Sequence, residues 1–488
     1  MNALSVKHQK EVFLNYKLSF IFLTSLLLLL NGCALLHPKH PESVAAVDVP
    51  AQWSVDEAVA TSNSTSLKEW WQRFNDTQLD TLIEQSLQTN TSINSAKFAL
   101  IEARALRDVA AATLLPTLDS AASAGRSKSG QNSSVNNVKV GLDASWELDV
   151  FGANRSALSA SDATAQASEA SLGDIQVSIA AEVALDYIAL RNAQARLAIA
   201  NSNLTNQLET LQITQWRTQA GLVSSLDAEQ ARVSAEQTRA IIPPLQTAIE
   251  QTSHALAVLT GQPPAALLKQ LSVVNPVPQA ANNLALNFPA ETLRQRADVR
   301  AAEHRVSADL ARLAQADAAR LPNFTLSGSL GLSALTLGSL TSGSSVVRSL
   351  LANVAMPLFD GGSRRAKVRA QEAVLEQTRL SYKATVLTAL QETEDALVAL
   401  RGDLERLSRL KLASEAAGNA ALMARQRYDS GLADFQVVLE TQRSLLNAQD
   451  SVANASADVS SDHIRLYKAL GGGWQTSETD TTTLPIKN

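Results

Sequence analysis

The sequence predicts a mainly α-helical chain with membrane-spanning β-strands, organised as two structural repeats. Three observations lead to this: very long proline-free stretches, segments of strict apolar–polar alternation, and motifs that recur in the same order in both halves. Of the 488 residues, 45% are hydrophobic but only 4% are aromatic, which suits long, closely packed helices. The formal net charge of −5 argues against a nucleic-acid partner, because domains that bind nucleic acid are usually basic.

The N-terminal segment up to Cys33 has the pattern of an export signal. Three lysines precede an apolar run from Leu18 to Leu30, which is shorter than the about 20 residues that a membrane helix needs. The run ends in Leu30-Asn31-Gly32-Cys33, which resembles the bacterial lipobox, whose cysteine becomes the acylated first residue of the mature protein. This resemblance implies a signal peptide over 1–32 and a lipid anchor in the outer membrane at Cys33. An ordinary signal peptide with a chance cysteine is the alternative.

The rest of the chain repeats itself. Each half reads as a helix, a Leu-Pro stop, a middle stretch, a Phe-Gly motif, a very long helix, a Gly-Leu turn and a long helix. The matching motifs are Leu115-Pro116 with Leu321-Pro322, Phe151-Gly152 with Phe359 to Gly362, and Gly221-Leu222 with Gly431-Leu432. We expect a lipidated segment over 33–75, repeats over 76–270 and 291–470, a proline-rich linker over 271–290 and a flexible tail over 471–488.

The two longest helices are expected between Asn154 and Gln219 and between Asp360 and Ser430, since neither stretch contains proline. At 1.5 Å per residue each approaches about 100 Å, a length found in coiled coils rather than in ordinary domains. The pair Pro243-Pro244 is expected to break or kink the helix that follows the first of them.

Four segments read as long strands. In Val138–Val150, apolar residues alternate strictly with polar ones, and this segment is longer than the strands of soluble proteins usually are. The other strands are expected over Thr117–Gly125, Phe324–Ala334 and Leu350–Leu358, with exposed loops rich in Ser, Gly and Asn between the members of each pair. Strands of about 9–11 residues with one apolar face are typical of outer-membrane barrels.

Four strands cannot close a barrel around water, because the smallest single-chain barrels have eight. An open edge is not tolerated in lipid, so we expect a barrel shared between chains. Three chains give 12 strands and a modest pore, and two give eight and a bore filled by side chains. A soluble sandwich is disfavoured because the strands come without a second apolar layer.

With these features the sequence resembles a known family, the TolC-like outer membrane factors, in the lipoprotein branch of multidrug efflux channels. The residues that carry the resemblance are Trp70-Trp71, Phe74, Asp76, Leu79, Leu82 and Ile83; Trp146 to Gly152; Arg296 to Arg300, with Ala297 where proline is usual; and Leu470 to Trp474. The resemblance implies a homotrimer with a 12-stranded β-barrel continuous with a 12-helix periplasmic α-barrel. It also implies a passive exit duct for small toxic compounds that works with a periplasmic adaptor protein and an inner-membrane pump.

The candidate site lies at the turns Gly221 and Gly431, which must form the helix tips farthest from the strands and hence the periplasmic mouth. The resemblance implies that this mouth is closed at rest by acidic rings and polar links between helices. The candidate gate residues are Asp227, Asp434, Glu440, Arg217, Arg427 and Tyr428. Converging carboxylates attract cations and repel anions at a narrow mouth. Ordinary solvated side chains at helix ends are the alternative.

Trp146, Phe151, Phe324 and Phe359 stand at strand ends, where aromatic residues suit a membrane-interface girdle and equally suit packing at the junction of barrel and helices. The histidines lie without partners at ligand spacing, so we expect no metal and no cofactor.

Three other functions fit the sequence less well. The outer-membrane channel of a type I protein secretion system shares the fold, but the lipobox and the Gly-Gly-Gly-Trp ending favour efflux. A periplasmic adaptor has coiled-coil hairpins and lipid anchors, but lacks long strands and a duplicated hairpin. An enzyme is disfavoured because the sequence shows no nucleophile–base pair, phosphate-binding loop or metal cluster.

Overall fold

The computed structural model describes residues 49–50, 53, 67–128, 130–131, 133–280 and 289–474. These residues all belong to one compact unit, Ala46–Asn488. The predicted signal peptide, Cys33 and the tail from residue 475 onward lie outside the described residues.

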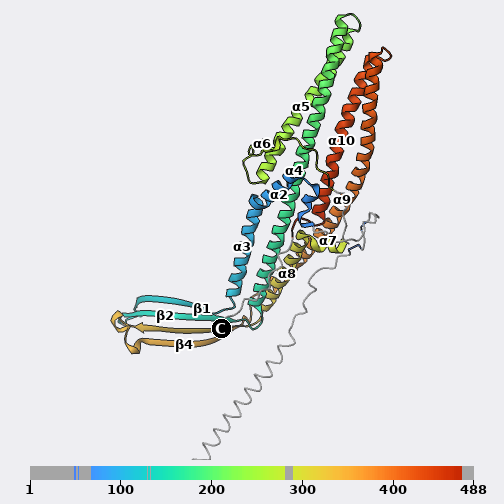
Figure 1. Cartoon of the computed structure of the whole chain (residues 1–488). Helices are drawn as coiled ribbons and strands as arrows, with labels where there is room; N and C mark the ends of the chain where they lie inside the picture. Colours follow the sequence, from blue (N-terminus) through green and yellow to red (C-terminus); the bar gives the residue numbers. More distant parts are fainter. Residues whose placement is uncertain are drawn as a thin grey trace, which may run out of the picture. The chain divides into compact units, whose positions relative to one another are not determined.

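The two halves of the chain follow the same order of elements (Figure 1). The long helices α4 and α9 have 67 residues each, and the helices α5 and α10 that follow them have 35 each. The first half contains η2 (Leu67–Phe74), α2 (Thr77–Thr89), α3 (Thr91–Ala112), β1 (Thr117–Ser127), β2 (Val135–Leu148), α4 (Ala153–Gln219), α5 (Ser225–Leu259) and α6 (Leu268–Leu271). The second contains α7 (Pro289–Gln295), α8 (Ala297–Ala318), β3 (Asn323–Ala334), η3 (Leu337–Ser339), η4 (Gly343–Ser345), β4 (Val346–Ala355), α9 (Ser363–Asp429) and α10 (Phe435–Ala469).

The strands lie side by side in one antiparallel sheet with the order β1-β2-β3-β4 (Figure 1). The register keeps the apolar side chains on one face, because Leu142 of β2 stands opposite Leu330 of β3 and Trp146 stands opposite Leu326. On the other face Asp143 stands opposite Asp119 of β1. Two facing carboxylates need water, so this face is a hydrated one.

Each very long helix begins on a left-handed glycine that follows an aspartate. The Asp149 carboxylate accepts hydrogen bonds from the main-chain N–H of Asn154 and Arg155 at the start of α4. Asp360 accepts from the N–H of Gly362 and Arg364 at the start of α9. Since the first N–H groups of a helix have no partner inside it, these carboxylates fix where both helices start.

The principal core joins η2, α2, α4, α5 and α10. Trp70 stacks on Tyr467 of α10 with ring centroids 5.5 Å apart and meets Trp71 edge-on at 5.7 Å. Val183 and Ile188, from the apolar stripe predicted in α4, are fully buried in the same core. The aromatic residues near position 70 therefore anchor the segment before α2 to the last helix of the chain.

Of the expected break or kink at Pro243-Pro244, the break was wrong, because α5 runs from Ser225 to Leu259 across both prolines. The two rings remove the hydrogen bonds that the carbonyls of Arg239 and Ala240 would otherwise accept. Both prolines are exposed, so water can hydrate these carbonyls and the helix continues.

The first residues of the predicted tail are packed. The N–H of Gly473 donates to the Leu67 carbonyl at 3.0 Å, and the indole of Trp474 donates to the Gln295 carbonyl at 3.0 Å. The predicted linker begins at the last residue of α6 and ends at the second residue of α7, with residues 281–288 outside the described part.

Candidate functional site at the helix tips

The turns after α4 and α9 have the same geometry. Gly221 and Gly431 adopt φ angles of 68° and 71°, which an L-residue with a side chain rarely adopts. The next residue donates back to the helix in both: Leu222 N–H to the Arg217 carbonyl and Leu432 N–H to the Arg427 carbonyl, each at 2.8 Å. This Schellman arrangement ends both helices at equivalent positions.

The structure brings two predicted gate residues together, one from each tip. The Arg217 guanidinium lies 4.9 Å from the centroid of the Tyr428 ring and 3.7 Å from the carboxylate of Asp429. Tyr428 packs in turn on Phe435 of α10, with ring centroids 5.3 Å apart. Arg427, by contrast, is exposed. A cation over an aromatic face beside a carboxylate is an attractive contact that ties the end of α4 to the end of α9.

The predicted acidic residues have different local roles. Asp227 completes a capping box at the start of α5, where its carboxylate accepts from the N–H and hydroxyl of Ser224. Asp434 is the exposed residue that precedes α10 and makes no side-chain cap bond. Glu440 is exposed and lies 3.7 Å from Arg443, one turn further along α10. Asp434 and Glu440 are thus the two predicted acids left open to solvent at this end.

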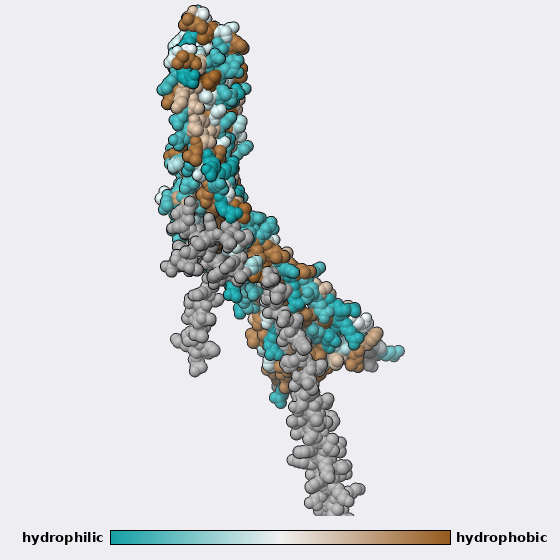
Figure 2. Space-filling view, turned by 90° about the vertical axis from the view of Figure 1, so that its right-hand side faces the viewer, coloured by the Kyte–Doolittle hydropathy of each residue, from teal (hydrophilic) through white to brown (hydrophobic). Residues whose placement is uncertain are grey.

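Apolar side chains are also present at the tips. A small buried cluster of Ala231, Phe435 and Leu439, with Leu211 and Tyr428 packed on it, draws residues from α4, α5, α9 and α10. Leu222 and Leu432 at the two turns are 73% and 70% exposed. Figure 2 shows such apolar residues interrupting the hydrophilic surface of the helical hairpins.

The four predicted interface aromatics lie in three settings. The Trp146 indole donates to the Leu114 carbonyl at 3.0 Å and so ties β2 to the segment that follows α3. Phe151 and Phe324 meet with ring centroids 6.2 Å apart. Phe359 is 92% exposed in the single chain.

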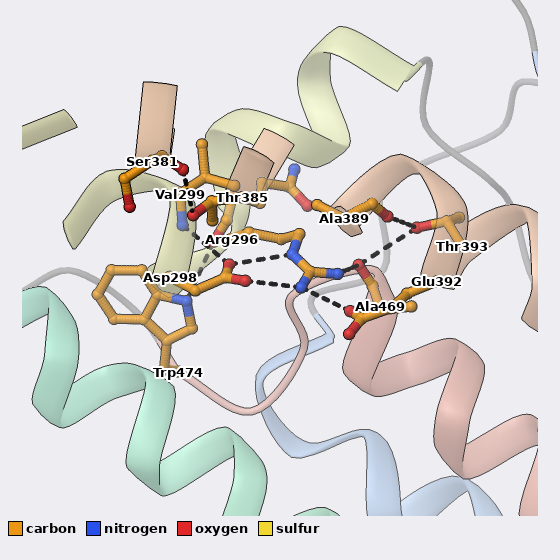
Figure 3. Close-up of polar contacts among 11 residues, drawn as sticks. Arg296, Asp298, Val299, Ser381, Thr385, Ala389, Glu392, Thr393, Ala469 and Trp474 are labelled. Atoms are coloured by element: carbon orange, nitrogen blue, oxygen red, sulfur yellow. Dashed lines mark hydrogen bonds and ion pairs between the residues drawn. The ribbon is translucent and has the colours of Figure 1, made fainter. Parts of the chain in front are cut away.

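The 296–300 motif forms a polar junction far from the tips (Figure 3). The buried Arg296 guanidinium donates to Asp298, to Glu392 of α9 at 2.7 Å and to the Ala469 carbonyl at the end of α10 at 3.0 Å. Arg296 precedes α8, so Ala297 occupies the first helical position, where proline is well tolerated. Sequence reasoning missed Glu392 and Ala469, because nothing local marks residues so far apart as partners.

Within the part of the chain that the structure describes, no helix is long and apolar enough to cross a membrane. The same residues contain no group of three His, Cys, Asp or Glu side chains that could hold a metal ion.

The comparisons with known proteins agree on one family. The family model of outer membrane efflux proteins matches residues 82–262 and 288–472. The solvent efflux pump outer membrane protein SrpC of Pseudomonas putida is 31% identical over 468 residues, which cover 93% of this chain and 98% of that protein. Nodulation protein T of Rhizobium leguminosarum bv. viciae is 31% identical over 450 residues, 92% of each chain.

Solved structures give the same result. The outer-membrane channel OprN is 36% identical, with a TM-score of 0.84 over 90% of this chain and 98% of that chain. The outer membrane protein VceC of Vibrio cholerae is 28% identical, with a TM-score of 0.78 over 84% of this chain and 99% of that chain. The family model and these relatives therefore define the class of protein, an efflux channel of the outer membrane. The chain belongs to the outer membrane efflux protein family, which confirms the family expected from its motifs.

Proposed function

We propose that three copies of the chain form the exit duct of a tripartite efflux system. Each copy contributes β1–β4 to a 12-stranded barrel and its long helices to a 12-helix periplasmic tunnel. A periplasmic adaptor joins the duct to an inner-membrane pump, and the duct itself conducts passively. The matching element lengths of the two halves, and the two separate matches of the family model, support an internal repeat over 76–270 and 291–470.

The observation that carries the proposal is the sheet. Its outer strands β1 and β4 have no strand partner on their far sides within the described residues. One face carries Leu142, Leu330 and Trp146, and the other carries the facing carboxylates of Asp119 and Asp143. Such a sheet is stable in a bilayer only if its edges are paired, and pairing with further copies places the apolar face in lipid and the acidic face toward a water-filled bore.

The helix tips are proposed as the periplasmic gate. Arg217, Tyr428 and Asp429 hold the two tips together, and the exposed Asp434 and Glu440 supply negative charge around the mouth. Asp227 contributes by fixing the start of α5. Arg427 contributes through its carbonyl, which accepts from Leu432 N–H and so ends α9 at the second turn. Three copies around an axis would set these acids in rings that favour cations.

Single-channel recording in a planar bilayer tests the proposal. We expect the purified protein to give a small, cation-preferring conductance. The double variant Glu440→Ala, Asp434→Ala should lose cation preference or conduct more, whereas Glu236→Ala, an exposed acid further along α5, should not. Absence of conductance from folded protein would reject the duct, and unchanged selectivity in the double variant would move the gate elsewhere.

Cargo and anchoring complete the proposal. Because one relative is named as part of a solvent efflux pump, we propose small apolar compounds as cargo.

Cys33, outside the described residues, is proposed as the acylated residue that adds a lipid anchor. Labelling cells with radioactive palmitate should mark the protein and not a Cys33→Ser variant, and label in both would place acylation elsewhere.

A further inference from the structure

A row of polar residues on α4 faces the second half of the chain. Arg196, Asn203, Thr210 and Arg217 are spaced seven residues apart, so they lie along one side of the helix. Each makes a side-chain contact with the end of α9 or with α10, and the partners on α10 run in the opposite direction. We call this row and its partners the α4–α10 ladder.

The contacts of the ladder change in kind along its length. Nearest the tip, Arg217 meets Tyr428 and Asp429. Next come two neutral contacts, from Gln442 to the Thr210 hydroxyl at 3.2 Å and from Asn203 to Gln449 at 2.8 Å.

The contact farthest from the tip is a bidentate ion pair between Arg196 and Asp450. Arg196 Nε donates to Asp450 Oδ1 at 2.6 Å, and Nη2 donates to Oδ2 at 3.2 Å. Asn454 donates to the same carboxylate at 3.1 Å and accepts from Asn192 at 2.9 Å. Bidentate, charge-assisted bonds are shorter and stronger than neutral ones, so this end of the ladder is its firmest point.

The packing inside the second hairpin is of the opposite kind. Between α9 and α10 lie apolar clusters: Leu407 with Ala455 and Val459, and Leu397 with Leu466 and Leu470. Separating apolar surfaces exposes them to water, whereas separated polar groups exchange their partners for water at little net cost. Apart from the apolar tip cluster of Ala231, Phe435 and Leu439, the ladder joins the two hairpins through polar contacts, so the hairpins can part along it while the second hairpin stays packed.

One ladder oxygen, that of Gln442, and two amide oxygens of neighbouring α4 residues are already unsatisfied. In the described structure, the buried amide oxygens of Asn192, Gln207 and Gln442 have no hydrogen-bond partner. Buried polar atoms without partners are costly, so a movement that hydrates them or gives them new partners regains that cost. The neutral middle of the ladder is thus poised to rearrange.

We propose that the Arg196–Asp450 pair is the fulcrum of opening, by which we mean the point at which separation of the two hairpins stops. The ladder contacts break in order from Arg217 as far as this pair, and the pair thereby limits the width of the mouth. Arg196 and Asp450 are positioning residues for conduction. The inference rests on the proposed gate at the tips and adds to it the point at which the opening stops.

The test is single-channel recording of variants built on Arg217→Ala, which releases the tip. Adding Arg196→Gln should raise the open probability, or the conductance of the open level, by about fivefold, as expected for a coupling of moderate strength. The charge-swapped variant Arg196→Asp, Asp450→Arg in the same background should return it toward the level of Arg217→Ala alone. Arg239→Gln, at an exposed pair on α5, is the matched control and should change nothing.

The outcomes separate the two claims. If Arg217→Ala raises conduction and Arg196→Gln adds nothing to it, or the swap of charges fails to restore the lower level in folded protein, the fulcrum is rejected and the gate stands. If no variant conducts, the duct itself is rejected. A merely structural role of Arg196 would lower the thermal stability without the rescue of conduction by the swap.

Discussion

Arg296 shows how much of this fold depends on single side chains that join distant segments. Its guanidinium is buried and reaches the start of α8, the middle of α9 and the last carbonyl of α10. A carbonyl at the C-terminal end of a helix lacks an intrahelical partner and carries partial negative charge, so an arginine is well suited to it. The side chain therefore fixes the end of α10 against α8 and α9.

Replacing Arg296 with methionine keeps much of the volume but removes the guanidinium donor from Asp298, Glu392 and the Ala469 carbonyl. Asp298 keeps the N–H of Val299, and Ala469 keeps the hydroxyl of Thr393. Breaking a buried pair costs about 3–5 kcal/mol, and because Glu392 is half-exposed we expect about 2 kcal/mol of lost stability. Denaturant unfolding followed by circular dichroism measures it. Arg232→Met, at an exposed pair on α5, should change stability by less than about 0.5 kcal/mol. Equal effects of the two variants would contradict the role given to Arg296.

Asp462 on α10 is a second residue whose environment has a measurable consequence. Burial raises the pKa of its carboxyl to about 6 from 3.8, and the carboxylate of Asp403 on α9 adds to the rise, while Arg465 opposes it. Oδ1 accepts from Arg465 at 2.7 Å, but the buried Oδ2 has no hydrogen-bond partner in the described structure. The folded protein therefore holds a proton on this carboxyl up to a higher pH than the unfolded chain does.

Since folding raises this pKa, the stabilising contribution of protonated Asp462 is complete below pH 3.8 and is lost as the pH rises through about 6. A shift of two pKa units corresponds to about 3 kcal/mol. We expect the stability of Asp462→Asn, which cannot ionise, to fall less between pH 4 and about 7 than that of the unchanged protein. Burial also raises the pKa of Asp186 to about 6, so the difference between the two proteins, rather than either slope, is the measurement. Parallel curves would contradict the assignment.

The helices show which signals in the sequence determine an element and which do not. The long proline-free stretches predicted α4 and α9 to within a few residues, because nothing in them interrupts a helix. The break at Pro243-Pro244 was wrong, since the cost of a proline depends on whether water can reach the freed carbonyls. The α4–α10 ladder carries a heptad signal in Arg196, Asn203, Thr210 and Arg217, but a search for apolar stripes passes over polar heptads.

The start of α5 offers a prediction that separates capping from gating. Ser224→Ala removes the hydroxyl that accepts from the N–H of Asp227, and the loss of a capping residue costs about 1 kcal/mol. If Asp227 acts mainly as part of the capping box, Asp227→Ala should lower stability by a similar amount and leave the cation preference of the channel unchanged. Denaturant unfolding and reversal potentials in a salt gradient measure the two effects. A loss of cation preference in Asp227→Ala alone would show that its charge acts at the mouth.

For the whole molecule, the sequence could predict strands, helices and their order, but not which contacts lie between copies. Strand alternation identifies an apolar face without saying what covers it, and Phe359 and Leu350, 92% and 78% exposed in one chain, have no local signal for their surroundings. The junction at Arg296 and the ladder depend on pairing between segments far apart in sequence. Such pairings are set by packing, which no local pattern records.

A pair of substitutions on β2 tests the arrangement of the whole assembly. Leu142 lies on the apolar face and Ser145, three residues along the same strand, lies on the face of Asp143. An arginine facing lipid near the middle of the membrane costs about 2–4 kcal/mol, whereas one lining the bore stays hydrated. Leu142→Arg should therefore lower the yield of trimer in outer membranes, measured by sedimentation after extraction. Ser145→Arg should assemble normally and weaken cation preference. Normal assembly of Leu142→Arg would mean that this face does not meet lipid, and the shared barrel would have to be abandoned.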